Sequence, residues 1–386
     1  MHKIITIVGA RPQIIKAAAL SRAFNNFPEI TELIVHTGQH YDFNMSAIFF
    51  EELNIPLPKY QLEVDDTDQD SQTAQMIAKL EPILLSEEPD LVIVYGDTNS
   101  TLAGTLAASK LQIPLVHIEA GMRSFNKSMP EELNRIIADS CSTLLFSPTL
   151  TGIENLKQEG FSTERIGTAG SNNPHIFHCG DIMLDNSLFF SATVNQKSTI
   201  LQKLNLEKNK FILSTIHRSA TTDNSKRLSA LLKSLINLAQ KFNEIIVFPI
   251  HPRTLKQLKQ DQTLDIYNQI QTTDNIILTE PLSYLDMIQL EQNSKLIITD
   301  SGGVQKEAYF FQKPCIIARK ETEWKELTDL GAAILCDVDL VKIESAYLQF
   351  IKHPTANFPP IFGDGNSANF IDKELDNYLN KHLKIN

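Results

Sequence analysis

Short apolar stretches rich in isoleucine and valine alternate along the chain with longer segments of mixed character. The apolar stretches of the first half are Ile4–Val8, Leu33–Thr37, Leu91–Tyr95, Pro114–Ile118 and Thr143–Phe146, and the helix-length segments are Ile14–Phe27, Met45–Leu53, Thr101–Leu111 and Glu131–Cys141. Short strands that alternate with helices predict right-handed βαβ units and a parallel sheet. Because the stretches are apolar on both faces, we expect helices on both sides of that sheet.

The alternation pauses over residues 163–195 and then resumes. The pause contains Gly167, Gly170-Ser171-Asn172-Asn173-Pro174 and Gly180-Asp181, which are typical of loops and turns. The later strands are predicted at Phe211–Ile216, Glu244–Ile250, Asn275–Thr279, Lys295–Thr299, Pro314–Ala318 and Ala332–Cys336. We therefore place a hinge near residues 180–195, between a first domain over residues 1–185 and a second over residues 186–365. Asn369–Leu383 predicts an amphipathic helix, and residues 366–386 are a candidate to complete the first domain.

Polar clusters follow five of these strands at the point where each strand ends. They are Tyr95-Gly96-Asp97-Thr98, His117-Ile118-Glu119-Ala120-Gly121, His217-Arg218, His251-Pro252-Arg253 and Asp300-Ser301-Gly302-Gly303. In open parallel sheets, ligands bind beyond the carboxyl ends of the strands. Because the clusters occur in both halves, we expect an α/β protein whose two parallel sheets face a central cleft, with the active site between the domains.

Length and charge narrow the class of protein. The 386 residues suggest two or three domains, and the apolar fraction of 42% is enough for two cores. The net charge of −11 argues against a nucleic-acid partner, which a basic face would bind. A local basic pocket for a phosphorylated small molecule is still compatible with this charge.

The cysteine pattern and the lengths of the apolar stretches indicate in which cellular compartment we expect the protein. Cys141, Cys179, Cys315 and Cys336 form no CxxC pair and no metal-ligand spacing, which favours free structural thiols in a reducing cytoplasm. Lys3–Val8 is too short for a signal peptide and is interpreted as the first core strand. No run approaches the roughly 18 apolar residues of a membrane span. We therefore expect a cytoplasmic protein without a membrane partner.

Two strand-to-helix turns are candidate anion sites. In the first, Gly9 permits a sharp turn and Pro12 suits the first helical position, so that free N–H groups of the helix start would lie between Arg11 and Lys16. In the second, Gly302 and Gly303 let the backbone approach a diphosphate.

Other residues of the second turn add specificity. Ser301 can donate a hydroxyl hydrogen bond, and Glu307 can accept from a ribose diol as the acidic residue of dinucleotide folds does. The alternative is an ordinary tight turn in which Glu307 is a first-turn helix acid.

Four carboxylates are the candidates for acid–base chemistry. Asp97 and Glu119 end two predicted strands, whereas Glu131 and Glu132 follow Pro130 at a predicted helix start. Acids at a helix start are often caps, and this is the favoured interpretation for Glu132. Clustering of Asp97, Glu119 and Glu131 would separate their pKa values, so that one could act as base and another as acid.

Histidines occur at three of the strand ends. His217, with Arg218 beside it, could stabilise a leaving phosphate, shuttle a proton or orient a carboxylate. His251 is a weaker candidate for substrate binding, with a structural or regulatory alternative. His117 shares a strand face with Glu119, but no HxH or HExxH pattern accompanies it, so we expect a structural histidine and no metal site.

Taken together, these motifs resemble the non-hydrolysing UDP-N-acetylglucosamine 2-epimerase family over nearly the whole chain. The residues that carry the likeness are Gly9-Ala10-Arg11-Pro12, Thr37-Gly38-Gln39-His40, Tyr95 to Thr101, His117 to Gly121, Met129 to Arg135, His217-Arg218, Thr299 to Glu307 and Phe362-Gly363-Asp364-Gly365. The resemblance implies a glycosyltransferase-B-like fold, with two Rossmann-like domains and the substrate between them.

Some stretches look more like one branch of that family, the UDP-2,3-diacetamido-glucuronic acid 2-epimerases of surface polysaccharide synthesis. They are Arg123-Ser124-Phe125-Asn126, Asp300 to Ala308 and Glu321-Thr322-Glu323-Trp324. The branch specific for UDP-N-acetylglucosamine more often has Thr-Glu-Arg-Pro where this chain has Thr322-Glu323-Trp324-Lys325.

The chain departs from the family pattern at two places. The family usually has His-Arg-x-Glu-Asn where this chain has His217-Arg218-Ser219-Ala220-Thr221, so the group that holds His217 is open, with Asp223 as one possibility. Substrate-activated members carry a second glutamine after a Gln-His motif, whereas Gln39-His40 is followed here by Tyr41-Asp42. We therefore expect no activation by substrate.

The resemblance implies inversion at C2 of a UDP-2-acetamido sugar by elimination and re-addition of UDP. Asp97, Glu119 and Glu131 would supply base and acid in an unassigned order, and His217 would assist the leaving UDP. Arg11, Lys16, Arg218, His251, Ser301, Gly302, Gly303 and Glu307 would bind the substrate.

No cofactor is expected, because nothing is oxidised, and we expect a homodimer. Three alternatives remain open: a hydrolysing epimerase that releases UDP and free sugar, a glycosyltransferase, and a non-catalytic nucleotide-sugar sensor.

Overall fold

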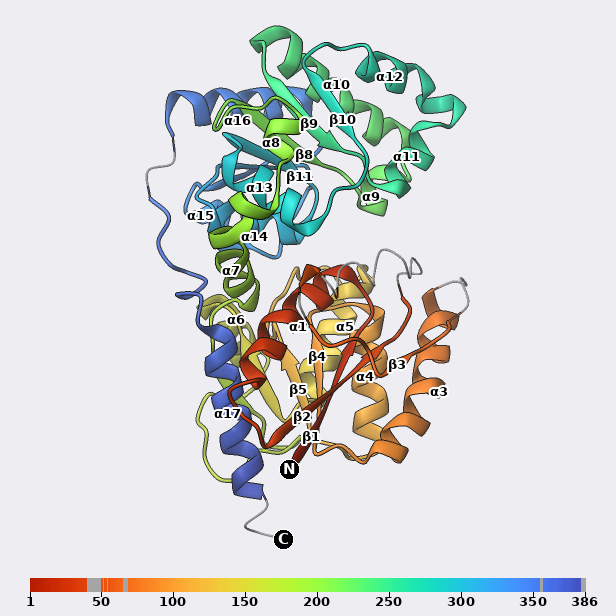
Figure 1. Ribbon diagram of the computed structural model, residues 1–386, viewed down its shortest axis with the longest axis vertical. Coiled ribbons are helices and arrows are strands. Elements are labelled where there is room, and N and C mark those ends of the chain that lie inside the picture. Colours follow the sequence, from red (N-terminus) through yellow and green to blue (C-terminus); the bar gives the residue numbers. More distant parts are fainter. Residues whose placement is uncertain (40–49, 51, 54, 65–68, 355–356, 383–386) are drawn as a thin grey trace. The chain divides into compact units, whose positions relative to one another are not determined.

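The computed structural model describes residues 1–39, 50, 52–53, 55–64, 69–354 and 357–382, and it confirms the α/β fold (Figure 1). The chain forms two compact units, each with one parallel sheet and interleaved helices. The first unit comprises Met1–Asn186 and Pro360–Asn386, and the second comprises Ser187–Pro359. Within the described ranges, no helix is both long and apolar enough to cross a membrane.

The first unit contains a seven-stranded sheet in the order β3-β2-β1-β4-β5-β6-β7. Its strands are β1 (His2–Val8), β2 (Ile30–His36), β3 (Tyr60–Gln61), β4 (Leu91–Tyr95), β5 (Leu115–Ile118), β6 (Leu144–Ser147) and β7 (His175–His178). All of the paired strands run parallel. The strand order reverses between β1 and β4, and such a switch point is where open α/β sheets bind ligands.

Helices cover both faces of the first sheet because its strands are apolar on both sides. They are α1 (Arg11–Phe24), α3 (Gln69–Glu87), α4 (Asn99–Lys110), α5 (Pro130–Cys141), α6 (Leu150–Gln158) and α17 (Ser367–His382). All five residues of β4 are buried, as a central strand requires. The helices α3 and α4 lie side by side in Figure 1 and share one hydrophobic core with β1, β4 and β5.

The second unit contains a six-stranded sheet in the order β10-β9-β8-β11-β12-β13. Its strands are β8 (Phe211–Thr215), β9 (Ile245–Pro249), β10 (Ile276–Thr279), β11 (Leu296–Thr299), β12 (Cys315–Ile317) and β13 (Ala333–Leu335). The strand order reverses between β8 and β11. The second switch point therefore lies between the end that leads to His217 and the end that leads to Ser301.

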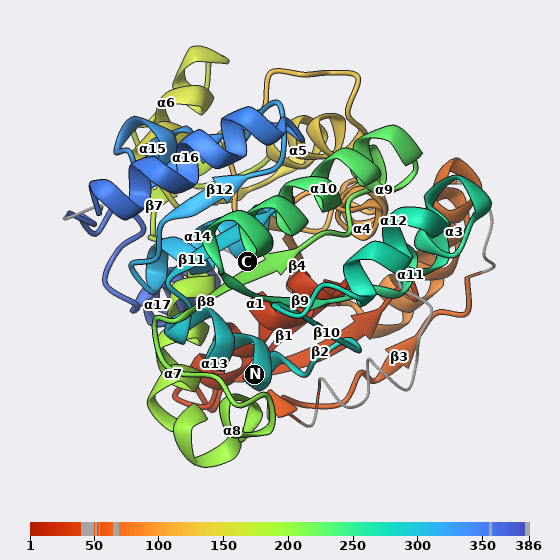
Figure 2. The same cartoon turned by 90° about the horizontal axis from the view of Figure 1, so that it is seen from above.

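The helices of the second unit are mostly amphipathic. They are α8 (Ile200–Lys203), α9 (Ser219–Thr222), α10 (Ser225–Phe242), α11 (Pro252–Leu258), α12 (Asp261–Gln271), α13 (Tyr284–Asn293), α14 (Gly302–Phe310), α15 (Lys325–Asp329) and α16 (Leu340–Lys352). Figure 2 shows α10 between α12 and α16, and these three helices share one core with the sheet. The side chain of Asn224 caps α10 by accepting from the N–H groups of Lys226 and Arg227, both at 3.1 Å.

Turn residues predicted loops over residues 163–195, and this prediction is wrong for the second part of the segment. It contains β7, and α7 (Ile182–Lys197) is one continuous helix across the predicted hinge. Asn186 and Ser187, at which the two units divide, lie within α7. The first buried residues of α7, Ile182, Met183 and Leu184, are consecutive, so the sequence lacks the spacing that announces an amphipathic helix.

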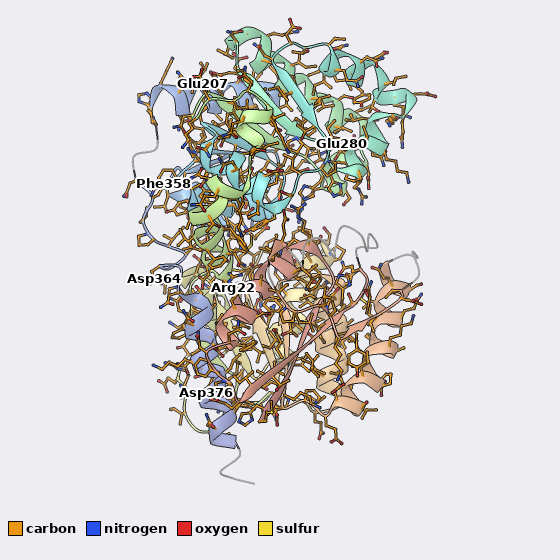
Figure 3. All side chains as sticks on the ribbon, viewed as in Figure 1. Arg22, Glu207, Glu280, Phe358, Asp364 and Asp376 are labelled. Atoms are coloured by element: carbon orange, nitrogen blue, oxygen red, sulfur yellow. The ribbon has the colours of Figure 1, made fainter. Side chains whose placement is uncertain are left out.

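The predicted amphipathic helix at the end of the chain is α17, which packs against α1 of the first unit. Asp185 of α7 caps it, because its carboxylate accepts from the N–H groups of Ser367 at 3.2 Å and Ala368 at 2.7 Å. Figure 3 labels Asp364, just before α17, and Asp376, in its second half.

Candidate active site

The side chain of Gln13 holds the turn between β1 and α1. Its Oε1 accepts from the N–H groups of Gly9 at 2.9 Å and Ala10 at 3.1 Å. Its Nε2 donates to the carbonyl oxygen of Tyr95, at the end of β4, at 3.0 Å. Gly9 and Ala10 precede α1, so these bonds hold the turn, and an anion site at the start of the helix stays a prediction.

Lys16 forms an ion pair with a candidate catalytic carboxylate. Its Nζ lies 2.8 Å from Oε2 of Glu119, and both side chains are largely buried, at 7% and 13% exposure. Gly96 closes over this pair, since a Cβ there would lie 3.1 Å from Lys16 Nζ and 3.4 Å from Glu119 Oε1. The structure thus brings Lys16 to Glu119, while the half-buried Arg11 stands at the start of the same helix.

Arg135 of α5 joins two of the candidate carboxylates. Its guanidinium pairs with Asp97 and, at 2.9 Å, with Oε2 of Glu132. Burial raises the pKa of Glu132, but hydrogen bonds from the Ser124 N–H and hydroxyl, from Arg135 and from the Phe125 N–H outweigh burial and leave the pKa below its usual value. Glu132 is thus a carboxylate that holds the loop at Ser124 and Phe125, and among the described residues the structure shows no cap of its own helix by this side chain.

Glu131 occupies the first turn of the same helix and is half-buried. In the part of the chain that the structure describes, its carboxylate has no hydrogen bond or ion pair. Asn134, one turn later, donates to the carbonyl oxygen of Asp97 at 2.9 Å. The structure therefore brings Asp97 and Glu119 to neighbouring strand ends and places Glu131 on the helix that holds Asp97.

His117 is fully buried, and both of its ring nitrogens are hydrogen bonded. Nδ1 lies 2.6 Å from Oδ1 of Asp139, and Nε2 lies 2.8 Å from the carbonyl oxygen of Gly96. The expectation of a structural histidine is confirmed.

Gln39 of the Gln-His motif is anchored to the start of α4. Its Oε1 accepts from the N–H of Ser100 at 3.0 Å and from the Ser100 hydroxyl at 2.6 Å. His40, Tyr41 and Asp42, on which the expectation about substrate activation rests, lie outside the described residues.

In the second unit, Asp300 holds the backbone of the His217-Arg218 turn. This fully buried carboxylate accepts from the N–H of His217 at 3.0 Å and from the N–H of Arg218 at 3.0 Å. Asp223, the possible substitute for the missing family glutamate, instead pairs with Arg253. The anchor of this turn therefore comes from the end of β11, which neighbours β8 in the sheet.

The rings of His217 and His251 lie together, with centroids 5.4 Å apart. His251 is exposed and caps α11, because its Nδ1 accepts from the N–H of Arg253 at 3.2 Å. In the neutral ring, the proton of His251 then sits on Nε2. Arg218, which follows His217, is half-buried and occupies the N-cap position of α9 without a side-chain capping hydrogen bond.

The start of α14 combines a side-chain cap with two glycines. The hydroxyl of Ser301 accepts from the N–H of Val304 at 3.4 Å, and the Ser301 N–H donates to the Thr299 hydroxyl at 2.9 Å. Gly302 and Gly303 are the first two helical residues, whose N–H groups have no acceptor within a helix. This end of α14 can therefore receive an anion.

The segment 319–324 packs onto the same turn. A Cβ at Gly302 would lie 2.4 Å from Oε1 of Glu323, so a larger residue there requires the Glu323 carboxylate to move. Glu323 is paired with Arg319 at 2.9 Å, and Thr322 donates to Oε1 of Gln305 at 2.7 Å. The stretch that resembles one branch of the family thus contacts the candidate diphosphate site.

Glu307 lies in α14 and is 6% exposed, next to the buried Lys306. The ammonium group of Lys306 lies 4.3 Å from the centre of the Trp324 ring. The structure therefore places Glu307 in the helix whose first turn holds the two glycines, next to Gln305 and Lys306, which contact Thr322 and Trp324.

Comparison with known proteins identifies the family. The family model described as UDP-N-acetylglucosamine 2-epimerase matches residues 22–376. The chain belongs to this family. A UDP-N-acetylglucosamine 2-epimerase homolog of Methanococcus maripaludis is 46% identical over 97% of this chain and 99% of its own length. The UDP-2,3-diacetamido-2,3-dideoxy-D-glucuronate 2-epimerase of Pseudomonas aeruginosa is 47% identical, with the same two coverages.

A solved structure of the family has the same fold. The crystal structure of the Methanocaldococcus jannaschii UDP-GlcNAc 2-epimerase in complex with UDP-GlcNAc and UDP superimposes with a TM-score of 0.88. The two chains are 38% identical over 97% of this chain and 99% of the other. The family resemblance stated from the motifs and the glycosyltransferase-B-like α/β architecture are therefore confirmed.

Sequence reasoning missed the residues that hold the candidate site together. They are Gln13, Arg135 and Asp139, and the anchoring role of Asp300. Gln13, Arg135 and Asp139 are all buried polar residues. Arg135 and Asp139 lie inside the predicted helix Glu131–Cys141 and Gln13 directly precedes the predicted helix Ile14–Phe27, and a polar residue among apolar helix positions is the signal that could have marked them.

Proposed function

We propose that this member of the family inverts C2 of a UDP-2-acetamido sugar by eliminating UDP and adding it back. The observation that carries the proposal is the placement of two cation-paired carboxylates at neighbouring strand ends, Glu119 on Lys16 and Asp97 on Arg135. Carboxylates held in different surroundings can divide the roles of base and acid. Asp97 and Glu119, with Glu131 as the third candidate, remove and return the C2 proton.

Residues of the second unit bind UDP in this proposal. The N–H groups of Gly302 and Gly303 and the Ser301 hydroxyl bind the diphosphate, and Glu307 accepts from the ribose. His217, Arg218 and His251, which follow the neighbouring strands β8 and β9, stabilise charge on the leaving UDP. Arg11 adds a further positive charge, whereas Lys16 serves Glu119.

The sugar is UDP-N-acetylglucosamine or a UDP-2,3-diacetamido-glucuronic acid, the two substrates that the names of the relatives support. Thr322 and Glu323 contact α14 and belong to the stretch in which the chain looks more like the diacetamido branch. Both sugars should therefore be tested as substrates. The proposed enzyme needs no cofactor. The homodimer expected from the sequence is checked by light scattering.

The deciding experiment is proton NMR of the enzyme with each sugar in deuterated water. We expect the manno product to carry deuterium at C2 because the proton passes through carboxyl groups that exchange with solvent. Product that keeps protium at C2 contradicts elimination. Free UDP that accumulates in step with product indicates the hydrolysing reaction instead.

A further inference from the structure

The buried pair formed by His117 and Asp139 touches the backbone on both sides of the candidate site. Both side chains are 0% exposed, and Nδ1 of His117 lies 2.6 Å from Oδ1 of Asp139. The other nitrogen, Nε2, lies 2.8 Å from the carbonyl oxygen of Gly96. A carbonyl oxygen only accepts, so Nε2 is the donor of this bond. The bond therefore fixes the residue that precedes Asp97.

The second oxygen of Asp139 holds the strand end that carries Glu119. Oδ2 accepts from the N–H of Gly121 at 3.1 Å and pairs with Nη2 of Arg123 at 2.7 Å. Gly121 stands two residues after Glu119, and His117 stands two residues before it. One carboxylate thus restrains the chain on each side of Glu119.

Glu119 needs such restraint because of its backbone conformation. Its φ of +75° lies in the left-handed region, which a non-glycine residue occupies only when the surrounding structure enforces it. Its own N–H donates to the carbonyl oxygen of Phe146 at 3.0 Å, which ties Glu119 to β6. The bonds of Asp139 to His117 and Gly121 fix the flanking residues.

The charges of the group support an ionised Asp139. Burial raises the pKa of this carboxyl, but His117 and Arg123 lower it more, and the net pKa lies below the usual value. An ionised carboxylate can accept at both oxygens, so Asp139 can hold His117 and Gly121 at the same time.

The same helix also holds Asp97 by its side chain. Asp139 lies one turn after Arg135 on α5, and Arg135 pairs with the carboxylate of Asp97. Gly96 in turn packs over the ion pair of Lys16 and Glu119. A shift of the Gly96 carbonyl would therefore move both candidate carboxylates.

We infer that His117 and Asp139 are positioning residues for the epimerase reaction: they hold the two strand ends that present Asp97 and Glu119. The inference rests on the catalytic roles proposed for those two carboxylates. A merely structural role predicts only a loss of stability when His117 or Asp139 is replaced. A positioning role also predicts a lower turnover per folded molecule.

The test compares two substitutions of one residue. His117→Phe removes the donor to Gly96, and we expect kcat to fall about 100-fold, the scale of a misplaced reacting group. KM should change less than about threefold, and UDP affinity should stay the same because neither His117 nor its hydrogen-bond partners are among the residues proposed to bind UDP. His117→Gln keeps an N–H that can donate to Gly96, so its kcat should be at least about tenfold higher than that of His117→Phe.

The matched control is Glu87→Ala. Glu87 is also buried and binds Lys3 at 3.1 Å and Lys59 at 2.6 Å, but Lys3 stands at the beginning of β1, away from the carboxyl ends. We expect this variant to lose thermal stability and keep kcat. The inference is overturned if His117→Phe keeps its turnover per folded molecule, or if Glu87→Ala loses as much kcat at equal loss of Tm.

Asp139→Asn decides the case in which His117→Phe does not fold. Its amide can donate to a neutral His117, and its oxygen can accept from Gly121, so the geometry survives without the charge. We expect kcat within about threefold of wild type, and a loss near 100-fold overturns the inference. Wild-type enzyme that fails to exchange the C2 proton of either UDP-sugar refutes the proposed function itself, whereas an active wild type with an unaffected His117→Phe refutes only the positioning role.

Discussion

Glu119 has two properties that are rare in one residue, a left-handed backbone and a largely buried carboxylate. Its φ is +75°, and its side chain is 13% exposed and 2.8 Å from Lys16. Backbone strain of this kind costs about 1–3 kcal/mol, persists only where the surrounding structure enforces it, and is frequent at active sites. The observed strain and the buried ion pair both support a catalytic carboxylate. Asp97 has the second property in weaker form, since it is 28% exposed and paired with Arg135.

The first prediction at this scale concerns those two carboxylates. Glu119→Gln and Asp97→Asn should each lower kcat by about 100-fold or more, because general acid–base catalysis contributes about 10²–10⁴-fold. Steady-state rates with UDP-N-acetylglucosamine and with the diacetamido sugar measure the loss. Either variant with near-normal turnover would remove that residue from the mechanism.

Asp372 of α17 allows a prediction about pH. It is 0% exposed, its two oxygens have no hydrogen-bond partner in the described residues, and burial, with Asp376, Glu29 and Glu32 nearby, raises its pKa to about 7. The folded state therefore holds a proton that the unfolded chain, with a pKa near 3.9, has already released. The free energy of unfolding should decrease as pH rises through the interval between these values.

Asp372→Asn removes this titration, so it should raise Tm at pH 8 by about 2 °C or more. The gain should shrink towards pH 4, where the carboxyl of the folded wild type is already neutral. Calorimetry at both pH values measures the difference. An equal gain at both would show that ionisation is not the cause.

At the scale of elements, the sequence predicted most of the strands and failed where the signal was local turn chemistry or a very short strand. The strands β4, β8 and β11 each begin with at least three consecutive apolar residues and are buried over their whole length, as central strands are. The strand β3 has only two residues, and α7 follows a run of glycine and asparagine that suggested a loop. Tertiary packing decides both, and no local pattern records it.

The residues of the candidate site also form two groups, those that the sequence predicted and those that it did not. The strand-end residues Asp97, Glu119 and His217 could be predicted because parallel strands end at one edge. Their partners could not, since Arg135 reaches Asp97 across 38 positions and Asp300 reaches His217 across 83. Only the folded sheet brings such residues together.

The turn between β11 and α14 gives the element-scale prediction. Gly302→Ala places a methyl group 2.4 Å from the Glu323 carboxylate, which must then move away from the start of α14. We expect UDP affinity to fall about tenfold, roughly 1.4 kcal/mol, as measured by calorimetry. Gly170→Ala is the matched control, because nothing lies within 4 Å of a Cβ at that position. Equal effects of the two substitutions would contradict the role of this turn.

At the scale of the whole molecule, each unit has its own parallel sheet with its own switch point. The end of β4 in the first unit leads to Asp97, and the end of β11 in the second leads to Ser301 and the two glycines. The first unit carries Asp97 and Glu119, each paired with a cation. The second unit carries the start of α14, where the first N–H groups have no acceptor within the helix. This division supports chemistry by one unit and UDP binding by the other.

The last prediction separates these two tasks in the intact protein. UDP at 100 times its dissociation constant should stabilise the wild type by about 2.7 kcal/mol and raise Tm accordingly. Asp97→Asn should keep this shift while losing turnover. Glu307→Ala should lose about 1–3 kcal/mol of UDP binding, and with it roughly a third to nine tenths of the stabilisation by the same UDP concentration. Thermal unfolding with and without UDP measures both. A UDP shift that disappears in Asp97→Asn, or that survives unchanged in Glu307→Ala, would show that the first unit binds the nucleotide or that Glu307 is only a helix acid.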